Sequence, residues 1–429
     1  MRITYLVFAS FLKNSMNEST NGFLAEKWRR RALVGCCIAM IAALLLSRAV
    51  LSATMMLFIV LSLVHPHVRR QWKVFISAPV FWSTTLLFLI PMMSGLWSTD
   101  THAWRDILRI KLPLLILPFC FAATVFFTQK DWRLIASTFI LVTLLGVGWS
   151  TINYMMHARE IHRQYLLAGA LPTPLQNDHV RFSLQVAIAA LLALFLIQRK
   201  GHSGKWLRII LWVAIALFAG YLHLLAARTG LFCFYLGVAG LLIARIRRTG
   251  NRKFVFAFIM VLALPVAAYM MLPTFRNRIH YIQYDLRQTI SNIYEHGAND
   301  GNRFASIKAG LLLMEEEPLT GVGFGDIARV CRFWYEVHYP AMTERDYILP
   351  SSEWVLYGAG AGWLAVMLFT FVMLAPFFVV PLRRNVFWVL LNVFFACSYV
   401  FDIGLEVQYG IFLHCLLVFS CFHWFKHDT

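Results

Sequence analysis

The sequence has few charged residues and lacks the surface composition of a water-soluble protein. Charged residues make up 14% of the 429 residues, whereas soluble proteins carry roughly a quarter. Acidic residues are the scarcer kind, with 21 Asp and Glu against 39 Lys and Arg. Hydrophobic residues supply 59%, which excludes a disordered chain and a coiled coil, and the eight cysteines are too few for a disulfide scaffold. The class that remains is a polytopic membrane protein.

The motifs of nucleotide-dependent and metal-dependent enzymes are also missing. The chain contains no Walker lysine motif, so ATP-driven transport is disfavoured. Its GVGFGD stretch follows a helical pattern rather than a strand, and Asp326 stands where a dinucleotide-binding fingerprint has its third glycine. We therefore expect a glycine turn there. Seven of the eight cysteines lie within apolar runs and none has metal-ligand spacing, so we predict no metal and no other cofactor.

Long apolar runs predict an all-α polytopic membrane protein with about twelve transmembrane helices. A bilayer core of about 30 Å needs about 20 apolar residues in a helix, because every backbone amide must find its partner within the segment. A transmembrane barrel would instead show alternating segments of about ten residues. The expected spans are residues 32–47, 49–64, 74–96, 112–127, 133–153, 180–198, 207–226, 229–246, 254–272, 354–381, 384–402 and 407–425.

The distribution of cations predicts the orientation of these spans. If the N-terminus is cytoplasmic, the inward connections and both tails together carry 23 Lys and Arg and 4 acidic residues. The outer side then carries 16 Lys and Arg and 17 acidic residues. Cytoplasmic connections are enriched in Lys and Arg, so both termini are predicted to be cytoplasmic. These cations are expected to face anionic lipid headgroups, and no nucleic-acid partner is expected.

One outer connection, between the ninth and tenth spans, is far longer than usual and indicates a functional element. The chain is accordingly divided into a cytoplasmic N-terminal segment (1–31), spans one to nine (32–272), a large periplasmic loop (273–352), spans ten to twelve (353–425) and a cytoplasmic tail (426–429). Within the loop, the period of RFASIKAGLLLM predicts an amphipathic helix. Its expected apolar face comprises Phe304, Ile307, Leu311 and Met314.

Several cations stand at the outer ends of predicted spans, where an ionisable side chain is costly and indicates a function. Arg181 opens the sixth span, and Arg228 lies in the tight turn LLAARTG after the seventh. Their small or polar neighbours suit close helix packing, so we predict functional roles for both. Arg109 and Lys111 are instead interpreted as cations that snorkel to the headgroups or are solvated in a loop. Arginines beside a water-filled cavity bind phosphate well, because they stay charged and donate bidentate hydrogen bonds.

Five separated stretches together carry a family resemblance. They are SGLWSTDTHAWRDILRIKLPLLILPF, LLAARTG, GNRFASIKAGLLLMEEEPLTGVGFGD, SSEWVLYGAGAGWLAV and FDIGLEVQYGIFLHCLLVF. Each is short, but their order, with about twelve spans and a large loop after the ninth, resembles the O-antigen ligase family of bacterial inner-membrane glycosyltransferases. That family includes related O-antigen polymerases and protein O-oligosaccharyltransferases.

The resemblance implies a reaction on the periplasmic face of the bacterial inner membrane. A glycan on undecaprenyl diphosphate is transferred to an acceptor hydroxyl, without metal or nucleotide. For the ligase proper, the acceptor is lipid A–core oligosaccharide. By motif match, Arg228 and Arg303 take the family's arginine roles, in which they bind the diphosphate and stabilise it as it leaves. Arg181 is a weaker match for a further arginine on the sixth span.

The chain departs from the family pattern just before the tenth span. The family usually carries a histidine there, proposed as the general base, but this chain has Ser351 and Ser352 followed by Glu353. Serine has no basic form near neutral pH. Glu353 could serve if burial raised its pKa, and His338 could approach from the loop. Alternatively, Glu353 is a helix-start acid, or the enzyme relies on arginines and positioning alone.

Three other functions remain open from the sequence. An O-antigen polymerase would use the same donor, with a second lipid-linked chain as acceptor. A transporter or flippase of lipid-linked glycan would also need arginines and a cavity, although the two halves show no internal repeat. A family member without the histidine could bind the lipid-linked glycan without transferring it.

Overall fold

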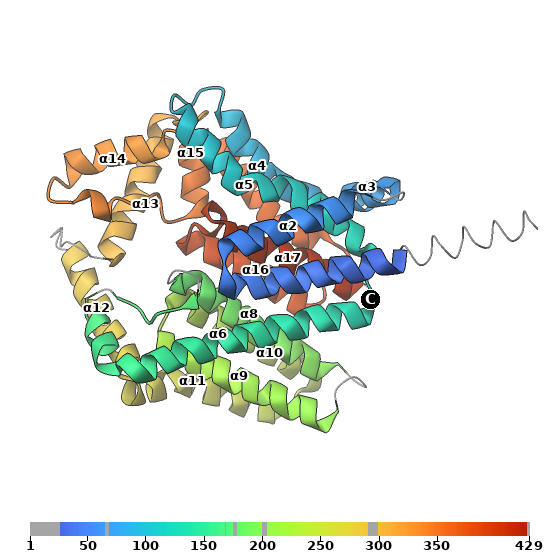
Figure 1. Ribbon diagram of the computed structural model, residues 1–429. Coiled ribbons are helices and arrows are strands. Elements are labelled where there is room, and N and C mark those ends of the chain that lie inside the picture. The colour runs from blue at the N-terminus through green and yellow to red at the C-terminus, as the bar shows by residue number, and fades with distance from the viewer. Residues whose placement is uncertain are drawn as a thin grey trace, which may run out of the picture.

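The computed structural model describes residues 26–64, 68–167, 169–174, 178–199, 204–290 and 299–426. Every regular element within these ranges is a helix, and they contain no strand (Figure 1). The predicted all-α class is therefore confirmed. Most of the predicted N-terminal segment and of the C-terminal tail lies outside the described residues.

The helices follow one another with short connections. The first described helix covers residues 26–46. It is followed by α2 (Arg48–Leu63), α3 (Val68–Ser77), α4 (Pro79–Ser94), α5 (Thr101–Ala122), α6 (Gln129–Gln164), α8 (His179–Gln198), α9 (Lys205–Leu225), α10 (Arg228–Thr249), α11 (Arg252–Met271), α12 (Pro273–Ile290), α13 (Asn299–Glu316), α14 (Ile327–His338), α15 (Glu353–Leu374), α16 (Val386–Phe401) and α17 (Gln408–Lys426). Short 3-10 turns are η1 (Ala123–Phe126), η2 (Glu344–Asp346), η3 (Ala375–Phe378) and η4 (Gly404–Glu406).

Eight helices in the described residues are long and apolar enough to cross a membrane. They are α5 with η1, α6, α8, α9, α10, α11, α15 with η3, and α17. α4 and α16 are apolar but shorter, with 16 residues each. Helices also cover the first two predicted spans. A multi-pass helical membrane protein is thus confirmed, whereas the number twelve stays a prediction.

Exposed apolar side chains on α9 and α11 fit this membrane class. Trp206, Ile210 and Trp212 on α9, and Phe256 and Met270 on α11, each expose more than half of their surface. In water, such a wide apolar surface would lead to association. In a bilayer the same side chains meet lipid tails, so the two helices form a lipid-facing flank.

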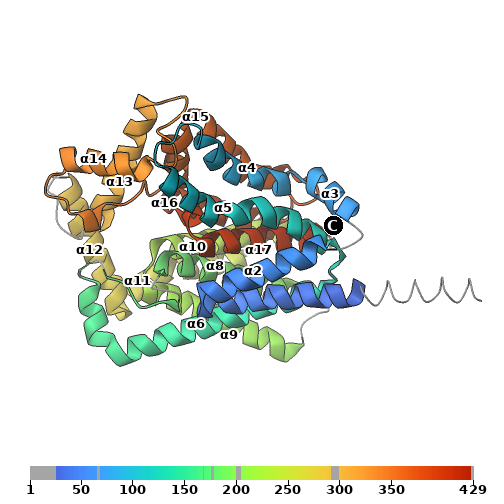
Figure 2. The same ribbon diagram turned by 45° about the horizontal axis from the view of Figure 1, so that its top comes forward.

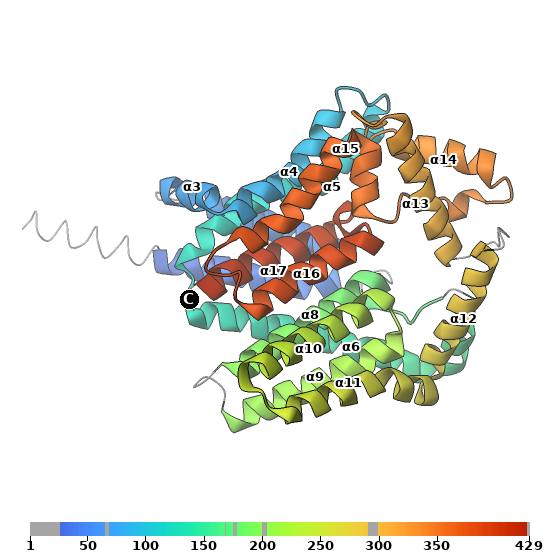
Figure 3. The same ribbon diagram turned by 180° about the vertical axis from the view of Figure 1, so that it is seen from behind.

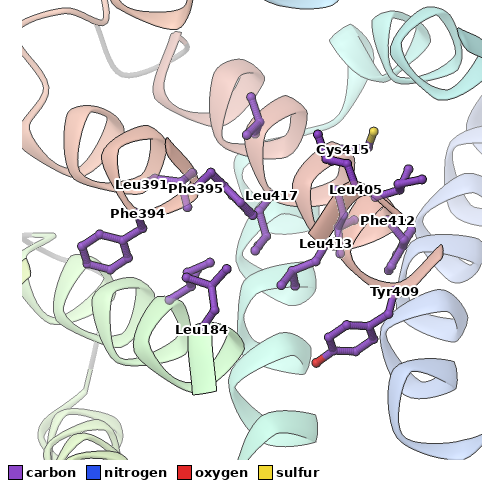
Figure 4. Packing of buried hydrophobic residues seen from close by; sticks show 14 of the residues in the cluster. Leu184, Leu391, Phe394, Phe395, Leu405, Tyr409, Phe412, Leu413, Cys415 and Leu417 are labelled. Carbon is purple, nitrogen blue, oxygen red and sulfur yellow. The ribbon is translucent and has the colours of Figure 1, made fainter. Parts of the chain in front are cut away.

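The core of the bundle surrounds its last helix. Within α17, 94% of the apolar stretch is buried. Figure 4 shows Leu413 and Leu417 of α17 on the side that faces Leu391 and Phe395 of α16, while Phe412 lies on the opposite side of α17. Because α17 is enclosed by protein, it can carry polar side chains that a lipid-facing helix could not. Its position fixes the short η4 turn that precedes it, which borders the candidate site.

The helices α12, α13 and α14 form a cover at one end of the bundle. Figures 1, 2 and 3 all place this cover at the end opposite the C-terminus. The starts of α9 and α11 and the end of α10 lie at the C-terminal end, and their connections carry many of the cations counted in the sequence. The segment predicted as a large loop is therefore largely helical and lies away from the most basic connections.

The predicted helix in this cover is present, but its predicted apolar face is only partly correct. Met314 is buried, whereas Phe304 and Leu311 are exposed, and Ala305 and Ala309 are buried in their place. Small residues form much of the buried face, because α13 lies very close to α15. Helices can approach in this way only where small side chains meet.

The glycine-rich stretch after α13 forms the turn expected from the sequence and is docked on a break in α15. Gly321 has φ +60°, a conformation that favours glycine. A Cβ added there would lie 2.5 Å from the carbonyl oxygen of Ala359. The next amide, of Val322, donates to that same oxygen at 2.8 Å. α15 is non-helical at Gly362, so the turn and the break hold the cover against the bundle.

Asp326, the last residue of the same stretch, ties the cover to the connection between α4 and α5. Its carboxylate accepts hydrogen bonds from the Thr99 amide at 2.6 Å and from the Asp100 amide at 3.3 Å. Arg329 also donates to it at 2.8 Å. Burial by itself raises the pKa of Asp326, but hydrogen bonds from Thr99 and Arg329 outweigh burial and hold this pKa below its usual range. The residue is a structural anchor rather than a nucleotide ligand.

Candidate active site

A small cavity lies beneath the cover, at the end of the bundle away from the C-terminus. It is formed by the start of α8, the turn between α9 and α10, α12 and α13, and its volume is about 40 Å³. Three arginines from three different helices line it. Its polar lining includes His179, Arg228, Arg278, Tyr281, Asp300 and Arg303. We refer to it as the arginine cavity.

A tight turn built from small residues positions Arg228 at this cavity. Ala226, directly after α9, has φ +49°, in the left-handed region. Gly230, in the first turn of α10, lies so close to α8 that an added Cβ would be 2.7 Å from the Ser183 carbonyl oxygen. The small neighbours of Arg228 therefore reflect close helix packing, as the sequence predicted. This packing sets Arg228 as the first residue of α10.

Arg228 forms a two-pronged ion pair with Asp300 on α13. Its Nη1 donates to Oδ2 of Asp300 at 2.8 Å, and its Nη2 pairs with Oδ1. The Arg228 side chain is 54% exposed and that of Asp300 is 21% exposed, so Arg228 is accessible from the cavity. A diphosphate carries more charge and more acceptor oxygen atoms than this carboxylate and could compete with it for Arg228.

Arg303 reaches the same cavity from α13 and is surrounded by other charges. Its Nη1 donates to the carbonyl oxygen of Phe401 at 3.0 Å. Burial lowers the pKa of Arg303; Asp402 and Asp300 oppose this effect, and Arg228 adds to it. A half-buried cation close to another cation is under-compensated, so this position favours an added anion.

Arg278 on α12 completes the group and was missed by the sequence interpretation. It is 8% exposed, donates to the Gly169 carbonyl oxygen at 2.8 Å and lies 4.9 Å from the centre of the Tyr165 ring. Burial lowers its pKa, and the charge of Arg228 lowers it further. The signal in the sequence was weak, since Arg278 and Tyr281 share a helical face only if the loop is helical there.

Arg181 does not line the arginine cavity and is held by two carboxylates instead. Its Nη1 lies 2.6 Å from Oδ2 of Asp178, the residue that caps α8, and its Nε lies 3.3 Å from Oδ2 of Asp402. Its Nη2 donates to the Ile403 carbonyl oxygen at 2.9 Å. Arg181 therefore secures the connection between α16 and η4, whose first part accepts the hydrogen bond from Arg303.

Glu353 lies on the other side of this connection, in a buried charged cluster. Its side chain has no exposed surface, and Oε1 accepts from the Leu405 amide at 2.6 Å. Oε2 has no hydrogen-bond partner among the described residues. Lys111, also without exposed surface, forms an ion pair with Glu406 and lies 3.3 Å from the Tyr357 hydroxyl. This cluster is separate from the arginine cavity.

The interpretation of Lys111 as a snorkelling or solvated cation is therefore wrong. α5 directs this side chain inward against α15 and η4, where Glu406 compensates its charge. Arg109, two residues earlier, points outward, is 76% exposed and pairs with Asp106 at 2.9 Å, which agrees with a solvated cation. The sequence could not distinguish the two because both lie at the same depth.

His338 and the serine pair lie at other places in the cover. His338 is exposed at the end of α14, stacked on Trp334 with 4.4 Å between ring centres, and does not line the arginine cavity. The Ser351 amide donates to the Ser306 hydroxyl at 3.1 Å, one turn beyond Arg303 on α13. The segment that replaces the family's histidine thus contacts the arginine-bearing helix, while His338 contacts Trp334.

The cavity is suited to an anion, and its lining includes two side chains that can accept a proton, the Asp300 carboxylate and the His179 imidazole. Guanidinium groups bind phosphate oxygens by charge-assisted hydrogen bonds. His179, the first residue of α8, is the one imidazole in the lining, and imidazoles exchange protons near neutral pH. Among the described residues, no group of three or more His, Cys, Asp or Glu side chains could hold a metal ion.

The fold and the cavity together define a helical, multi-pass membrane protein with a covered arginine site at one end of its bundle. Residues 213–370 match the family model described as O-antigen ligase, and this confirms the resemblance inferred from the motifs. The matched segment includes Arg228, α12, α13 and Glu353. It supports a membrane glycosyltransferase of the O-antigen ligase or polymerase type. No curated protein matches the chain.

Proposed function

We propose that the protein transfers a glycan from undecaprenyl diphosphate to a hydroxyl group of lipid A–core oligosaccharide, on the periplasmic face of the inner membrane. The observation that carries the proposal is the convergence of Arg228, Arg278 and Arg303 on one cavity. The family match over residues 213–370 supports the same class of reaction. The basic connections at the C-terminal end support a periplasmic position for the cover.

The reaction requires stabilisation of a diphosphate leaving group. The acceptor oxygen bonds to the anomeric carbon of the glycan, and the bond from that carbon to the diphosphate oxygen breaks. The electron pair stays on the diphosphate, and the hydroxyl proton passes to a base. Arg228, Arg278 and Arg303 would stabilise the growing charge on the diphosphate, because fixed cations in a partly buried site need no reorganisation.

Donor binding would open the arginine cavity. Its present volume of about 40 Å³ suits a few water molecules, since each needs about 10–15 Å³. The diphosphate would take the place of the Asp300 carboxylate on Arg228, because it carries more charge and more acceptor oxygen atoms than a carboxylate. Release of Asp300 would let the start of α13 move away from α10 and admit the donor.

We assign the proton acceptor to His179, and Glu353 and His338 are the alternatives. His179 lines the same cavity as the arginines. Glu353 is fully buried in the Lys111 cluster, behind the connection between α16 and α17. Its carboxylate would have to leave the Leu405 amide before it could reach an acceptor. His338 would have to leave its stack on Trp334.

The assignment of the base predicts a specific kinetic result. His179→Gln is expected to lower kcat by about a hundred- to ten-thousand-fold, as for loss of a general base. The measurement is transfer by the purified protein from a lipid-linked donor, with the melting temperature as a check of folding. An equal loss in Glu353→Gln or His338→Gln, with His179→Gln active, would overturn the assignment.

The proposed function itself is tested by deletion of the gene. We expect the deletion strain to lose all polysaccharide attached to lipid A–core, and the wild-type copy to restore it. The measurement is the lipopolysaccharide ladder on a gel. A single attached repeat would indicate an O-antigen polymerase instead. Movement of lipid-linked glycan between leaflets by purified protein, without transfer, would indicate a transporter.

A further inference from the structure

A second and much larger cavity lies at the C-terminal end of the bundle. It is enclosed by α8, α9, α10, α11 and α16, and shares no lining residue with the arginine cavity. Its volume is about 1030 Å³, at the upper end of the roughly 300–1,000 Å³ typical of small-molecule sites. Figure 3 shows α9, α10 and α11 along the flank where it lies. We call it the flank cavity.

The charged lining of the flank cavity has a single sign. It contains four arginines, Arg208, Arg245, Arg248 and Arg384, and no acidic residue. α9 and α16 begin at this end of the bundle and α10 ends there, so all four lie at the same end. Four cations without a carboxylate in the lining favour an anionic ligand.

Apart from Gln198, the rest of the lining is apolar, and it extends over the depth of one membrane leaflet. It includes Ile215, Ala219, Phe234, Val238, Val261 and Leu264. On α10 the apolar lining runs from Ala244 to Phe234, about 15 Å at about 1.5 Å per residue. Half of a bilayer core of about 30 Å is about 15 Å. The cavity therefore has a cationic end at headgroup level and an apolar part as deep as an acyl chain.

The helices that form the outer wall of the flank cavity bury little of their apolar surface inside the protein. Only 6% of the apolar stretch of α11 is buried, and 22% of that of α10. These helices must meet lipid over most of their surface. A lipid can therefore enter the cavity laterally from the bilayer. The deep apolar part of the cavity suits an acyl chain, which a water-soluble ligand lacks.

We propose that the flank cavity binds an anionic phospholipid from the leaflet at the C-terminal end, predicted to be the cytoplasmic leaflet. The arginines hold the phosphate by charge-assisted hydrogen bonds, and an acyl chain lies along α10. The glycan donor is a poorer occupant, because its diphosphate belongs to the opposite end of the bundle. The site is independent of the proposed transfer reaction.

The test compares lipids that differ only in headgroup charge. The purified full chain is offered equal amounts of phosphatidylglycerol and phosphatidylcholine with identical acyl chains, and retained lipid is measured by native mass spectrometry. We expect preferential retention of phosphatidylglycerol. The double variant Arg245→Gln with Arg384→Gln is expected to reduce this preference about tenfold or more, because each arginine contributes a charge-assisted bond.

The chain offers a matched control in Arg247→Gln with Arg383→Gln. These residues are direct or next neighbours of the first pair and are exposed, but they do not line the cavity, so the lipid preference is expected to persist. Equal retention of both lipids by the wild type, or an equal loss in the control, would overturn the proposal. The same holds if inorganic phosphate alone raises the melting temperature as much as phosphatidylglycerol does.

A second variant keeps the arginines and fills the apolar part of the cavity. Ala257 lies in the lining on α11, and Ala257→Phe would place a ring where the acyl chain is expected. We expect it to reduce retention of phosphatidylglycerol even if the arginine double variant does not fold. Unchanged retention in a folded Ala257→Phe protein would contradict the proposed position of the lipid.

Discussion

Substitution of Arg303 by alanine is expected to lower glycan transfer by about a hundred- to a thousand-fold, as for loss of one group that stabilises the leaving charge. The protein is expected to accumulate normally, because Arg303 makes a single hydrogen bond, to Phe401, and is crowded by Arg228. Removal of a cation from such a group relieves repulsion. The effect would thus be on catalysis and would appear as loss of the lipopolysaccharide ladder and of transfer in vitro.

Lys308→Ala is the matched control for this substitution. Lys308 lies on the same helix, is exposed, and does not line the arginine cavity, so its loss is expected to leave transfer unchanged. Arg228→Ala is expected to behave like Arg303→Ala. Arg303→Lys is expected to restore little, because lysine does not offer the two-pronged geometry of arginine. A wild-type ladder in Arg303→Ala would exclude a role in transfer.

The fold could be predicted from the sequence because its helices depend on local patterns. Apolar runs about 20 residues long specify membrane helices almost by themselves. The face that α13 buries could not be predicted in this way, because it depends on its neighbour. Ala305 and Ala309 are buried against α15, while the larger Phe304 is exposed. Hydrophobic periodicity predicts that the large apolar side chains of a helix are the buried ones. In α13 the close approach of α15 decided instead which face is buried.

The candidate site could be predicted only in part, for a related reason. Arg228 and Arg303 were selected because they stand in motifs. Arg278 and His179 carry no motif, and they reach the same cavity through the packing of α8 and α12, which are far apart in the sequence. Such long-range placement leaves no local pattern. The role of proton acceptor considered for Glu353 rests on its position before the tenth span, and it stays a prediction.

The buried cluster of Lys111, Glu353 and Glu406 predicts a large effect on stability. Lys111→Met would leave the buried Glu353 and the largely buried Glu406, whose side chain is 11% exposed, without the cation that faces them. Removal of one partner from a buried ion pair costs about 3–5 kcal/mol, because the remaining charge is neither hydrated nor compensated. We expect a strong fall in the melting temperature of the purified protein and in its accumulation in the membrane.

Two further variants separate charge from packing in this result. Arg109→Met removes a cation two residues away that is exposed, so we expect a change within about 0.5 kcal/mol. Adding Glu406→Gln to Lys111→Met removes one of the uncompensated carboxylates and is expected to recover part of the lost melting temperature. If Lys111→Met alone melts like the wild type, the ion pair does not stabilise the bundle. If the double variant recovers none of the lost melting temperature, the uncompensated charge of Glu406 did not cause the loss. The loss then came from the packing of the Lys111 side chain.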